Sequence, residues 1–262
     1  MQAMSKGVLI YAFNSTFNYV KSAEFAAKQV KKFLNLPVTL VTNEQMENEN
    51  FDSIIILNDT TSTPRDYRSD TNEVTTIKWL NGNRTSAYDI SPYDQTLLID
   101  ADYFMFNSSL SIMFDTDAEF ACFDKINDLT GEEKDLIRLG ETSIPMQWAT
   151  VIYFTKSRYA NAVFDFMNTI KKNWEYYSLL YGFRSSTYRN DFALSIALQT
   201  LSGYSTLNFN KLPGKLHTLF SHVSVLRVNE SEVKFAWQNQ LSKVINTNVH
   251  CMNKLAVEKF YA

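Results

Sequence analysis

The chain has 262 residues, of which 45% are apolar and 20% charged, and its formal net charge is −3. This composition excludes a disordered polypeptide and gives enough chain to bury the core of one large α/β domain. No run approaches the roughly 18 apolar residues of a membrane-spanning helix, so we expect no membrane partner.

The charge is distributed unevenly. Residues 1–39 carry a net charge of +4, residues 40–135 carry −14 and residues 136–262 carry +7. A basic C-terminal part suits a substrate with phosphates or a polyanion such as DNA, although scattered solvated charges would give the same count. The first residues lack an export signal, and Cys122 and Cys251 are too few for a disulfide framework. We therefore expect reduced thiols and a cytoplasmic location.

The N-terminal part alternates between strand and helix patterns. Apolar runs at residues 8–13, 37–42 and 54–57 predict strands, and helical spacing at residues 22–34 predicts a helix between the first two. Such a strand, helix and strand form a βαβ unit with parallel strands. Residues 58–76 are polar and predict a loop, and a helix is expected at residues 77–88. No glycine-rich phosphate loop occurs, which argues against dinucleotide cofactors and nucleoside triphosphatases.

The next strand, at residues 96–99, runs directly into two carboxylates. Its unbroken apolar run is typical of a buried parallel strand, and Asp100 and Asp102 follow it. In an open α/β sheet the ligand crevice lies beyond the carboxyl ends of the strands, and alternate residues of an extended chain share one side. Paired carboxylates there suit a divalent cation that carries a diphosphate. Two solvated acids at a strand end are the alternative.

Further strands and helices are expected beyond these acids. The patterns predict strands at residues 118–123 and 149–154 and helices at residues 159–174 and 189–198. Residues 124–147 form a long polar segment of the kind that serves as a lid or acceptor loop.

An aromatic segment at residues 174–188 has two interpretations. Its rings are interleaved with Lys171, Lys172, Arg184 and Arg189. They could stack on the bases or sugars of an acceptor, or they could form a packing layer.

Residues 91–102, with the sequence SPYDQTLLIDAD, resemble the metal-binding segment of GT-A glycosyltransferases, in which an Asp-x-Asp motif ends a central strand. The resemblance implies an α/β fold with a mixed, mostly parallel sheet flanked by helices. It also implies a single domain over residues 1–262, with a nucleotide-sugar-binding half at 1–103 and an acceptor-binding half at 104–262. Asp102 would then hold a metal ion, Asp100 would bind the same ion or the ribose of the donor, and a UDP-sugar would be the donor.

The same resemblance assigns a donor site to the loop after the first strand. Ala12, Phe13, Asn14 and Tyr19 occupy the positions that hold the base and ribose. Tyr19 either stacks on uracil or packs against the helix that follows. Arg84 is the candidate for contact with the ribose or the diphosphate.

His250 and Lys254 resemble the C-terminal His-x-x-x-Lys of glycogenin-like retaining glycosyltransferases, although the family's intervening glycine is absent. The resemblance makes His250 a third metal ligand and brings Lys254 to the diphosphate. An imidazole beside carboxylates favours Mn²⁺ over Mg²⁺. His217 and His222 are competing candidates for the third ligand.

Asp191 resembles the acid that precedes a helix in the same family and reaches the donor sugar or the acceptor. We assign it a catalytic role together with Lys254, and capping of the helix is the alternative. Residues 147–150 stand where the family has a small Asn-Ser-Gly set, so the sugar stays open.

The expected function is transfer of a sugar from a UDP-sugar to an acceptor, and the glycogenin-like ending implies that the anomeric configuration is retained. Some tailed phages encode compact glycosyltransferases that modify hydroxymethylcytosine in DNA, and the basic C-terminal half suits double-stranded DNA as a partner in the host cytoplasm. A protein, lipid or polysaccharide acceptor, a non-catalytic nucleotide-sugar-binding module and a nucleotidyltransferase remain alternatives. The oligomeric state is open.

Overall fold

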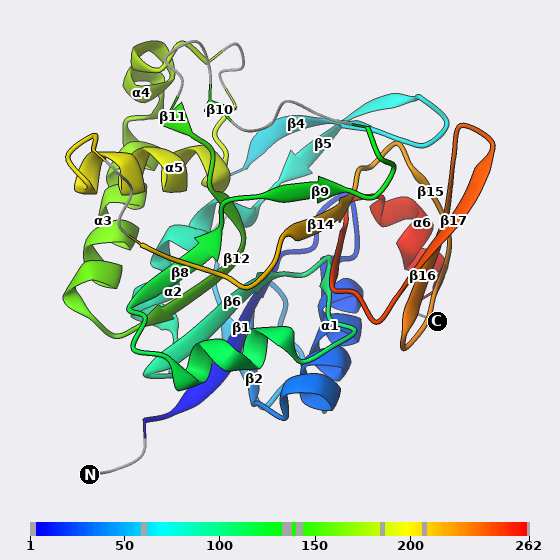
Figure 1. Cartoon of the computed structure of the whole chain (residues 1–262), viewed down its shortest axis with the longest axis horizontal. Coiled ribbons are helices and arrows are strands. Elements are labelled where there is room, and N and C mark those ends of the chain that lie inside the picture. Colours follow the sequence, from blue (N-terminus) through cyan, green and yellow to red (C-terminus); the bar gives the residue numbers. More distant parts are fainter. Residues whose placement is uncertain are drawn as a thin grey trace.

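The computed structural model describes residues 4–58, 62–132, 138–139, 144–183, 187–205 and 209–260. A seven-stranded sheet lies at its centre, in the order β13-β8-β12-β6-β1-β2-β3 (Figure 1). Its strands are β1 (Lys6–Ala12), β2 (Val38–Thr42), β3 (Ser53–Ile56), β6 (Gln95–Asp100), β8 (Phe120–Phe123), β12 (Trp148–Thr155) and β13 (Asn210–Lys211). Only β12 runs antiparallel to its neighbours, so the expected mixed, mostly parallel sheet is confirmed.

Helices flank this sheet. The α-helices are α1 (Tyr19–Leu34), α2 (Ala87–Ile90), α3 (Arg158–Lys172), α4 (Trp174–Leu180), α5 (Asn190–Leu201) and α6 (Lys254–Val257). The 3₁₀ turns are η1 (Asn81–Ser86), η2 (Ser109–Asp115) and η3 (Glu258–Phe260). Helix α1 packs on β1 and β2 and α5 packs on β12, whereas α3, α4 and α5 gather at one end of the molecule (Figure 1). None of the described helices combines the length and apolar character needed to cross a membrane.

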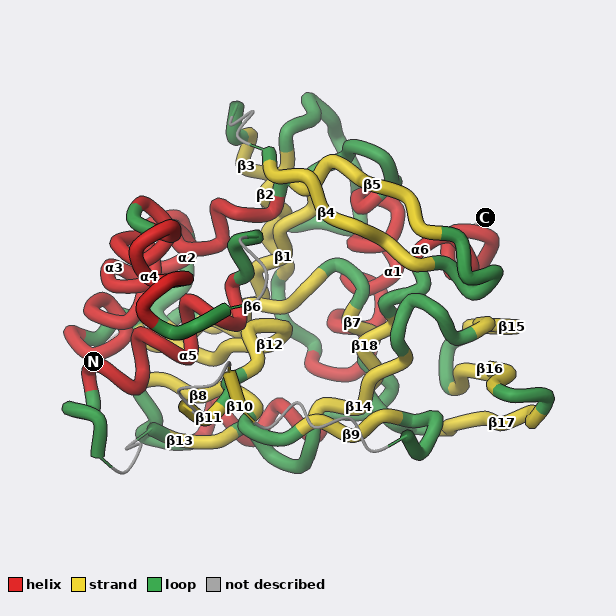
Figure 2. Tube along the Cα trace, turned by 90° about the horizontal axis from the view of Figure 1, so that it is seen from above, coloured by secondary structure: helices red, strands yellow, loops and turns green. Residues whose placement is uncertain are grey.

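Smaller sheets surround the central one. They comprise the hairpin β4 (Thr63–Arg68) and β5 (Val74–Trp79), the pair β10 (Arg138–Leu139) and β11 (Ile144–Pro145), the four strands β7 (Tyr103–Phe104), β18 (Val249–Cys251), β14 (Leu216–Leu219) and β9 (Ile126–Asp128), and the three strands β15 (Ser224–Val228), β16 (Glu232–Trp237) and β17 (Gln240–Ile245). Figure 2 shows the last of these at the opposite end of the molecule from α3 and α4.

The expectations for residues 58–88 are wrong in part. The expected loop contains the β4–β5 hairpin, and the expected helix begins as strand β5 and turns helical only at η1. The hairpin forms because Tyr67 and Ile77 bury against Phe17 in a small cluster of their own. The expected lid at residues 124–147 contains β9 and β11, and residues 133–137 and 140–143 of it lie outside the described residues.

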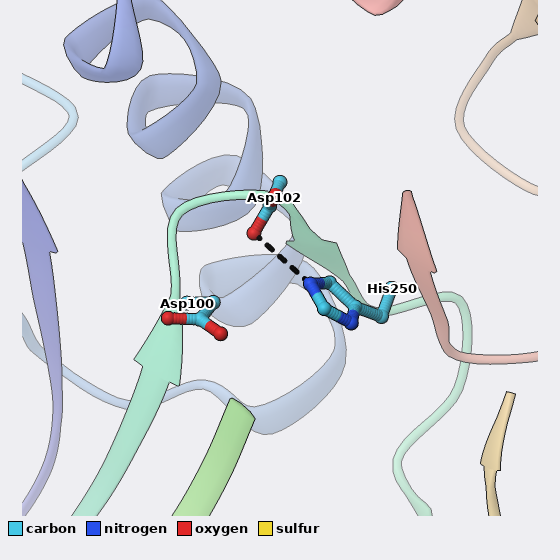
Figure 3. Close-up of side chains that lie close together, drawn as sticks. All are labelled: Asp100, Asp102 and His250. Carbon is cyan, nitrogen blue, oxygen red and sulfur yellow. Dashed lines mark ion pairs between the residues drawn. The ribbon is translucent and has the colours of Figure 1, made fainter. Parts of the chain in front are cut away.

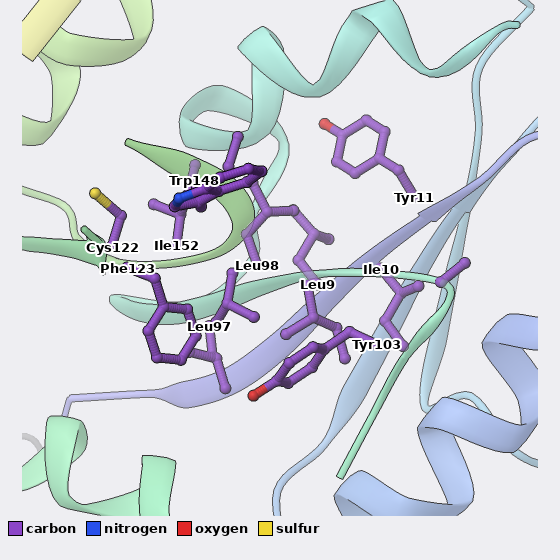
Figure 4. Close-up of a cluster of buried hydrophobic side chains, with 14 of the residues drawn as sticks. Leu9, Ile10, Tyr11, Leu97, Leu98, Tyr103, Cys122, Phe123, Trp148 and Ile152 are labelled. Carbon is purple, nitrogen blue, oxygen red and sulfur yellow. The ribbon is translucent and has the colours of Figure 1, made fainter. Parts of the chain in front are cut away.

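The core lies between the central strands and their helices. Leu9 and Ile10 of β1, Leu97 and Leu98 of β6 and Ile152 of β12 pack in one cluster (Figure 4), each at most 1% exposed. Such close packing fixes the ends of β1 and β6, and hence the side chains that follow them.

Gly7 gives a stability prediction for this core. A Cβ at Gly7 would lie 2.3 Å from Cζ of Tyr93, whose hydroxyl group shares a 2.8 Å hydrogen bond with Thr39. We expect Gly7→Ala to lower the free energy of unfolding by about 1–3 kcal/mol, because the ring has to move. Denaturant unfolding measures the loss, and the double variant Gly7→Ala/Tyr93→Leu should recover part of it. An equal penalty with and without the Tyr93 ring would contradict this explanation.

Candidate functional site

A pocket opens at the carboxyl ends of β1 and β6. Its lining includes Phe13 after β1, Asp100 and Asp102 at the end of β6, and Arg65 and Trp79 from the β4–β5 hairpin. This is the edge where ligands bind in open α/β sheets. The pocket therefore lies where the two carboxylates were expected to point.

Strand pairing brings His250 to these carboxylates although it is remote in sequence. Asp102 is followed directly by β7, and β7 pairs with β18 so that Tyr103 lies opposite His250. The backbone N–H of Cys251 donates to the carbonyl of Asp102 at 2.9 Å, which fixes the register. Figure 3 shows the three side chains facing one another, with Nε2 of His250 3.4 Å from Oδ1 of Asp102.

Two cations neutralise the carboxylates. Nζ of Lys254, at the start of α6, lies 2.7 Å from Oδ2 of Asp102, and Nη1 of Arg84 donates to Oδ1 of Asp100. Burial raises the pKa of Asp102, but Lys254 and His250 outweigh it and hold that pKa below its ordinary value. Burial lowers the pKa of Lys254, and the Asp102 carboxylate more than reverses this effect. Asp102 and Lys254 therefore form an ionised pair at the floor of the pocket.

Asp100 experiences a different balance. Burial raises its pKa above the ordinary value, and Arg84 opposes this rise while the neighbouring Asp102 adds to it. The pKa of Asp100 is thus raised in spite of Arg84, and a further positive charge beside this carboxylate would stabilise its ionised form.

The three side chains fit a divalent metal ion. Ligand atoms of Asp100, Asp102 and His250 all lie within 4.8 Å of one another, and these residues form the metal-type cluster found in the described part of the chain. Nδ1 of His250 lies 3.5 Å from Oγ1 of Thr150, which leaves Nε2 to face the carboxylates. One nitrogen and carboxylate oxygens suit Mn²⁺, and Mg²⁺ would accept the oxygens.

The competing histidines lie elsewhere. Nδ1 of His217 on β14 is 2.9 Å from the amide nitrogen of Asn127, and His222 stacks on Phe220 at 6.0 Å between ring centroids. Neither joins the cluster at the end of β6.

Arg84 lies on η1 and is only 3% exposed. One of its nitrogens contacts Asp100, but Nε and Nη2 have no hydrogen-bond partner among the described residues. Arg84 lines the pocket, but both of these nitrogens are buried, so the contact that the structure assigns to the guanidinium group is the neutralisation of Asp100.

Asp191 also lines the pocket, from the first turn of α5. Its carboxylate accepts from the backbone N–H of Ala149 at 2.9 Å and from Nη2 of Arg189 at 3.1 Å. The alternative that Asp191 caps the helix is wrong, because Arg189 occupies the cap position and no side chain makes a cap hydrogen bond there. Asp191 instead fastens β12 to α5 at the pocket wall.

Some residues of the loop after β1 line the pocket, and others belong to the core or hold the start of α1. Phe13 and Tyr19 line the pocket, and Nζ of Lys254 lies 5.6 Å from the centroid of the Tyr19 ring. Ala12 is 1% exposed and belongs to the core. Asn14 accepts from the backbone N–H of Val20 at 3.0 Å, so its side chain holds the start of α1.

The segments around β12 and α4 serve mainly as structure. Of residues 147–150 only Ala149 lines the pocket. Trp174 stacks on Phe183 at 5.3 Å and Phe183 stacks on Phe192 at 4.7 Å, which favours the packing layer over a stacking platform. Arg184 lies outside the described residues.

The sequence analysis missed the hairpin's contribution to the site. Arg65 and Trp79 enter the pocket from β4 and β5. The hydroxyl group of Tyr67 donates to Oδ1 of the buried Asn253 at 3.2 Å, and Nδ2 of Asn253 donates to the carbonyl of Val223 at 2.8 Å. These bonds tie the hairpin to the segment that carries Lys254. The available signal was weak: Ile77 and Trp79 alternate along β5, and Tyr67 is the large apolar residue of β4.

No family model matches this sequence, and no curated protein matches it. Among solved structures, the chain is similar to the glycosyltransferase GlyE of Streptococcus pneumoniae TIGR4, with a TM-score of 0.45 and 12% identity. That match covers 80% of this chain and 46% of the GlyE chain, so this chain spans less than half of that structure. It is also similar to the galactosyltransferase LgtC, solved with donor and acceptor sugar analogues, with a TM-score of 0.43, 14% identity and coverage of 73% and 70%.

Proposed function

We propose that this protein is a metal-dependent glycosyltransferase that moves a sugar from a UDP-sugar donor to an acceptor. The observation that carries the proposal is the cluster of Asp100, Asp102 and His250, with Lys254 on one of its carboxylates, at the edge of the sheet where nucleotides bind. The low-similarity structural matches add no weight to this argument. Mn²⁺ is the proposed ion, and Mg²⁺ is the alternative.

The residues of the pocket have complementary tasks in the proposed reaction. Asp100, Asp102 and His250 hold the cation, which when bound stabilises negative charge on the departing diphosphate. Lys254 lies on Asp102, and its ammonium group is placed to pair with a diphosphate oxygen. Arg84 balances the charge of Asp100 and adds positive charge to the pocket that receives the donor diphosphate.

The remaining donor contacts follow from the pocket wall. Tyr19 and Phe13 present rings on which a uracil base can stack. Asp191 lines the pocket and is held by the Ala149 N–H and by Arg189, and we assign its carboxylate to the hydroxyl groups of the donor sugar or the acceptor. Retention of configuration is part of the proposal, because Asp100, Asp102 and Asp191 are each bound to a cationic side chain and the fourth carboxylate of the pocket, Asp66, accepts a hydrogen bond from Thr76.

For the acceptor we propose hydroxymethylcytosine in phage DNA, which would place the reaction in the cytoplasm of an infected host. The support is the net charge of +7 over residues 136–262, which favours a polyanionic acceptor. A protein, lipid or polysaccharide acceptor would use the same donor site.

UDP release from a panel of UDP-sugars tests the proposal. With Mn²⁺, we expect one donor to give slow release alone and faster release with DNA that contains hydroxymethylcytosine, but not with unmodified DNA of the same sequence. Mass spectrometry of the DNA should show the added sugar. Release that DNA does not stimulate would reject the DNA acceptor and keep the transferase, whereas no release from any donor would indicate a binding module.

A further inference from the structure

We propose that Arg65 binds an oxyanion of the acceptor, a phosphate or a carboxylate group, beside the donor diphosphate. This inference rests on the proposed function and names the chemical class of the acceptor. Arg65 lies on β4 and lines the pocket, with its guanidinium carbon 5.6 Å from the centroid of the Trp79 ring. The guanidinium cation therefore lies over an aromatic ring, whose face attracts a positive charge.

Arg65 has no anionic partner within the described part of the chain. The ion pairs of the pocket are Arg84 with Asp100, Lys254 with Asp102 and Arg189 with Asp191. Partial burial of a guanidinium group without an ion pair destabilises its charged form. The contact with the Trp79 ring offsets this penalty only in part. The burial lowers the pKa of Arg65, and the positive charge of Arg189 lowers it further.

The charges of the proposed donor complex balance without Arg65. The two charges of a divalent cation match Asp100 and Asp102. With a cation at those carboxylates, Lys254 and Arg84 would be the two cationic side chains that match the two negative charges of the donor diphosphate. Arg65 is left as an additional cation in the pocket, so a second anion has to come from another substrate group.

The remaining charged groups of the pocket do not form an ion pair with Arg65. Arg189 stays paired with Asp191 at 3.1 Å. Asp66 also lines the pocket, but its Oδ1 accepts from Thr76 at 2.9 Å, and it makes no ion pair with Arg65 among the described residues. Asp66 is also exposed, so water screens its charge. Arg65 is thus the guanidinium group of the pocket that has no ion pair among the described residues.

Two small probes test this inference on the protein saturated with Mn²⁺ and UDP. Calorimetric titration with methyl phosphate and with acetate separates the two kinds of oxyanion. We expect one of them to bind, and Arg65→Gln to weaken that binding by at least about tenfold, as the loss of a charge-assisted hydrogen bond does. Arg68→Gln is the matched control, because Arg68 is exposed on the same strand and does not line the pocket.

The outcomes separate this inference from the proposed function. Equal oxyanion binding by the wild type and Arg65→Gln would overturn this inference. It would also be overturned if the wild type bound the oxyanion with Mn²⁺ alone but not when saturated with Mn²⁺ and UDP, since Arg65 would then serve the donor diphosphate. Failure of wild-type protein to bind UDP with Mn²⁺ appears before any oxyanion is added, and it would overturn the proposed function and this inference together. Partial recovery in Arg65→Lys would support a charge contact, because a loss of hairpin structure would not respond to the restored charge. Thermal unfolding of each variant checks that the fold is intact.

Discussion

Replacing Asp102 with Asn is expected to lower the rate of Mn²⁺-dependent UDP release by about 10²–10³-fold. Asn has the same shape but lacks the charge that both Lys254 and a divalent cation require. Asp102 is the one carboxylate that contacts both His250, at 3.4 Å, and Lys254, at 2.7 Å, among the described residues. Steady-state UDP release and the Mn²⁺ dissociation constant should therefore change together.

Asp94→Asn is the control for this substitution. Asp94 precedes β6 at the opposite end of the strand from Asp102, and it is bound to Ser5. Its variant should release UDP at the wild-type rate. Wild-type release by Asp102→Asn at unchanged Mn²⁺ concentration would show that the cluster is not the metal site.

The second large effect is expected for Lys254→Met. Methionine retains the length of the side chain but removes the ammonium group that meets Asp102 and, in the proposed complex, the diphosphate. We expect UDP release to fall by about 10²-fold, because one preorganised charge at the leaving group is lost. The affinity for UDP in the presence of Mn²⁺ should fall as well, since the diphosphate loses the same contact. Rate measurements and UDP titrations on the same preparation test both.

Lys259→Met provides the matched control, because Lys259 is exposed on η3 close to the same helix. It should keep the wild-type rate and affinity. If Lys254→Met lost stability but kept UDP affinity, Lys254 would be only a structural partner of the buried Asp102. The free energy of unfolding of Lys254→Met, measured without metal, separates that case.

The centre of the site could be predicted from sequence because its signals are local. An unbroken apolar run that ends in Asp100 and Asp102 identifies a buried strand and the edge at which its last side chains lie. His250 and Lys254 were found by resemblance only. Periodicity does not tell which strands pair, and it is the pairing of β18 with β7 that brings His250 beside Asp102.

The hairpin and the direction of β12 could not be predicted for a related reason. Residues 58–76 are rich in Thr, Ser, Asp and Arg, so the apolar pattern around Tyr67 is too weak to predict a strand. The hairpin is stabilised by packing against Phe17, a residue of another segment. Likewise an apolar run marks a buried strand without fixing its direction, and β12 lies antiparallel between β6 and β8. Asn14 shows a role that spacing does not reveal, because its side chain accepts from the N–H of Val20 and so holds the start of α1.

Calorimetric titration of UDP into the protein, with Mn²⁺ and with EDTA in its place, tests the central claim most directly. The claim is that Asp100, Asp102 and His250 hold a cation that joins a nucleotide diphosphate to Lys254. We predict that UDP binds in the presence of Mn²⁺ and that the binding is lost in EDTA. Equal binding of UDP in EDTA, or no binding in either buffer, would contradict the account.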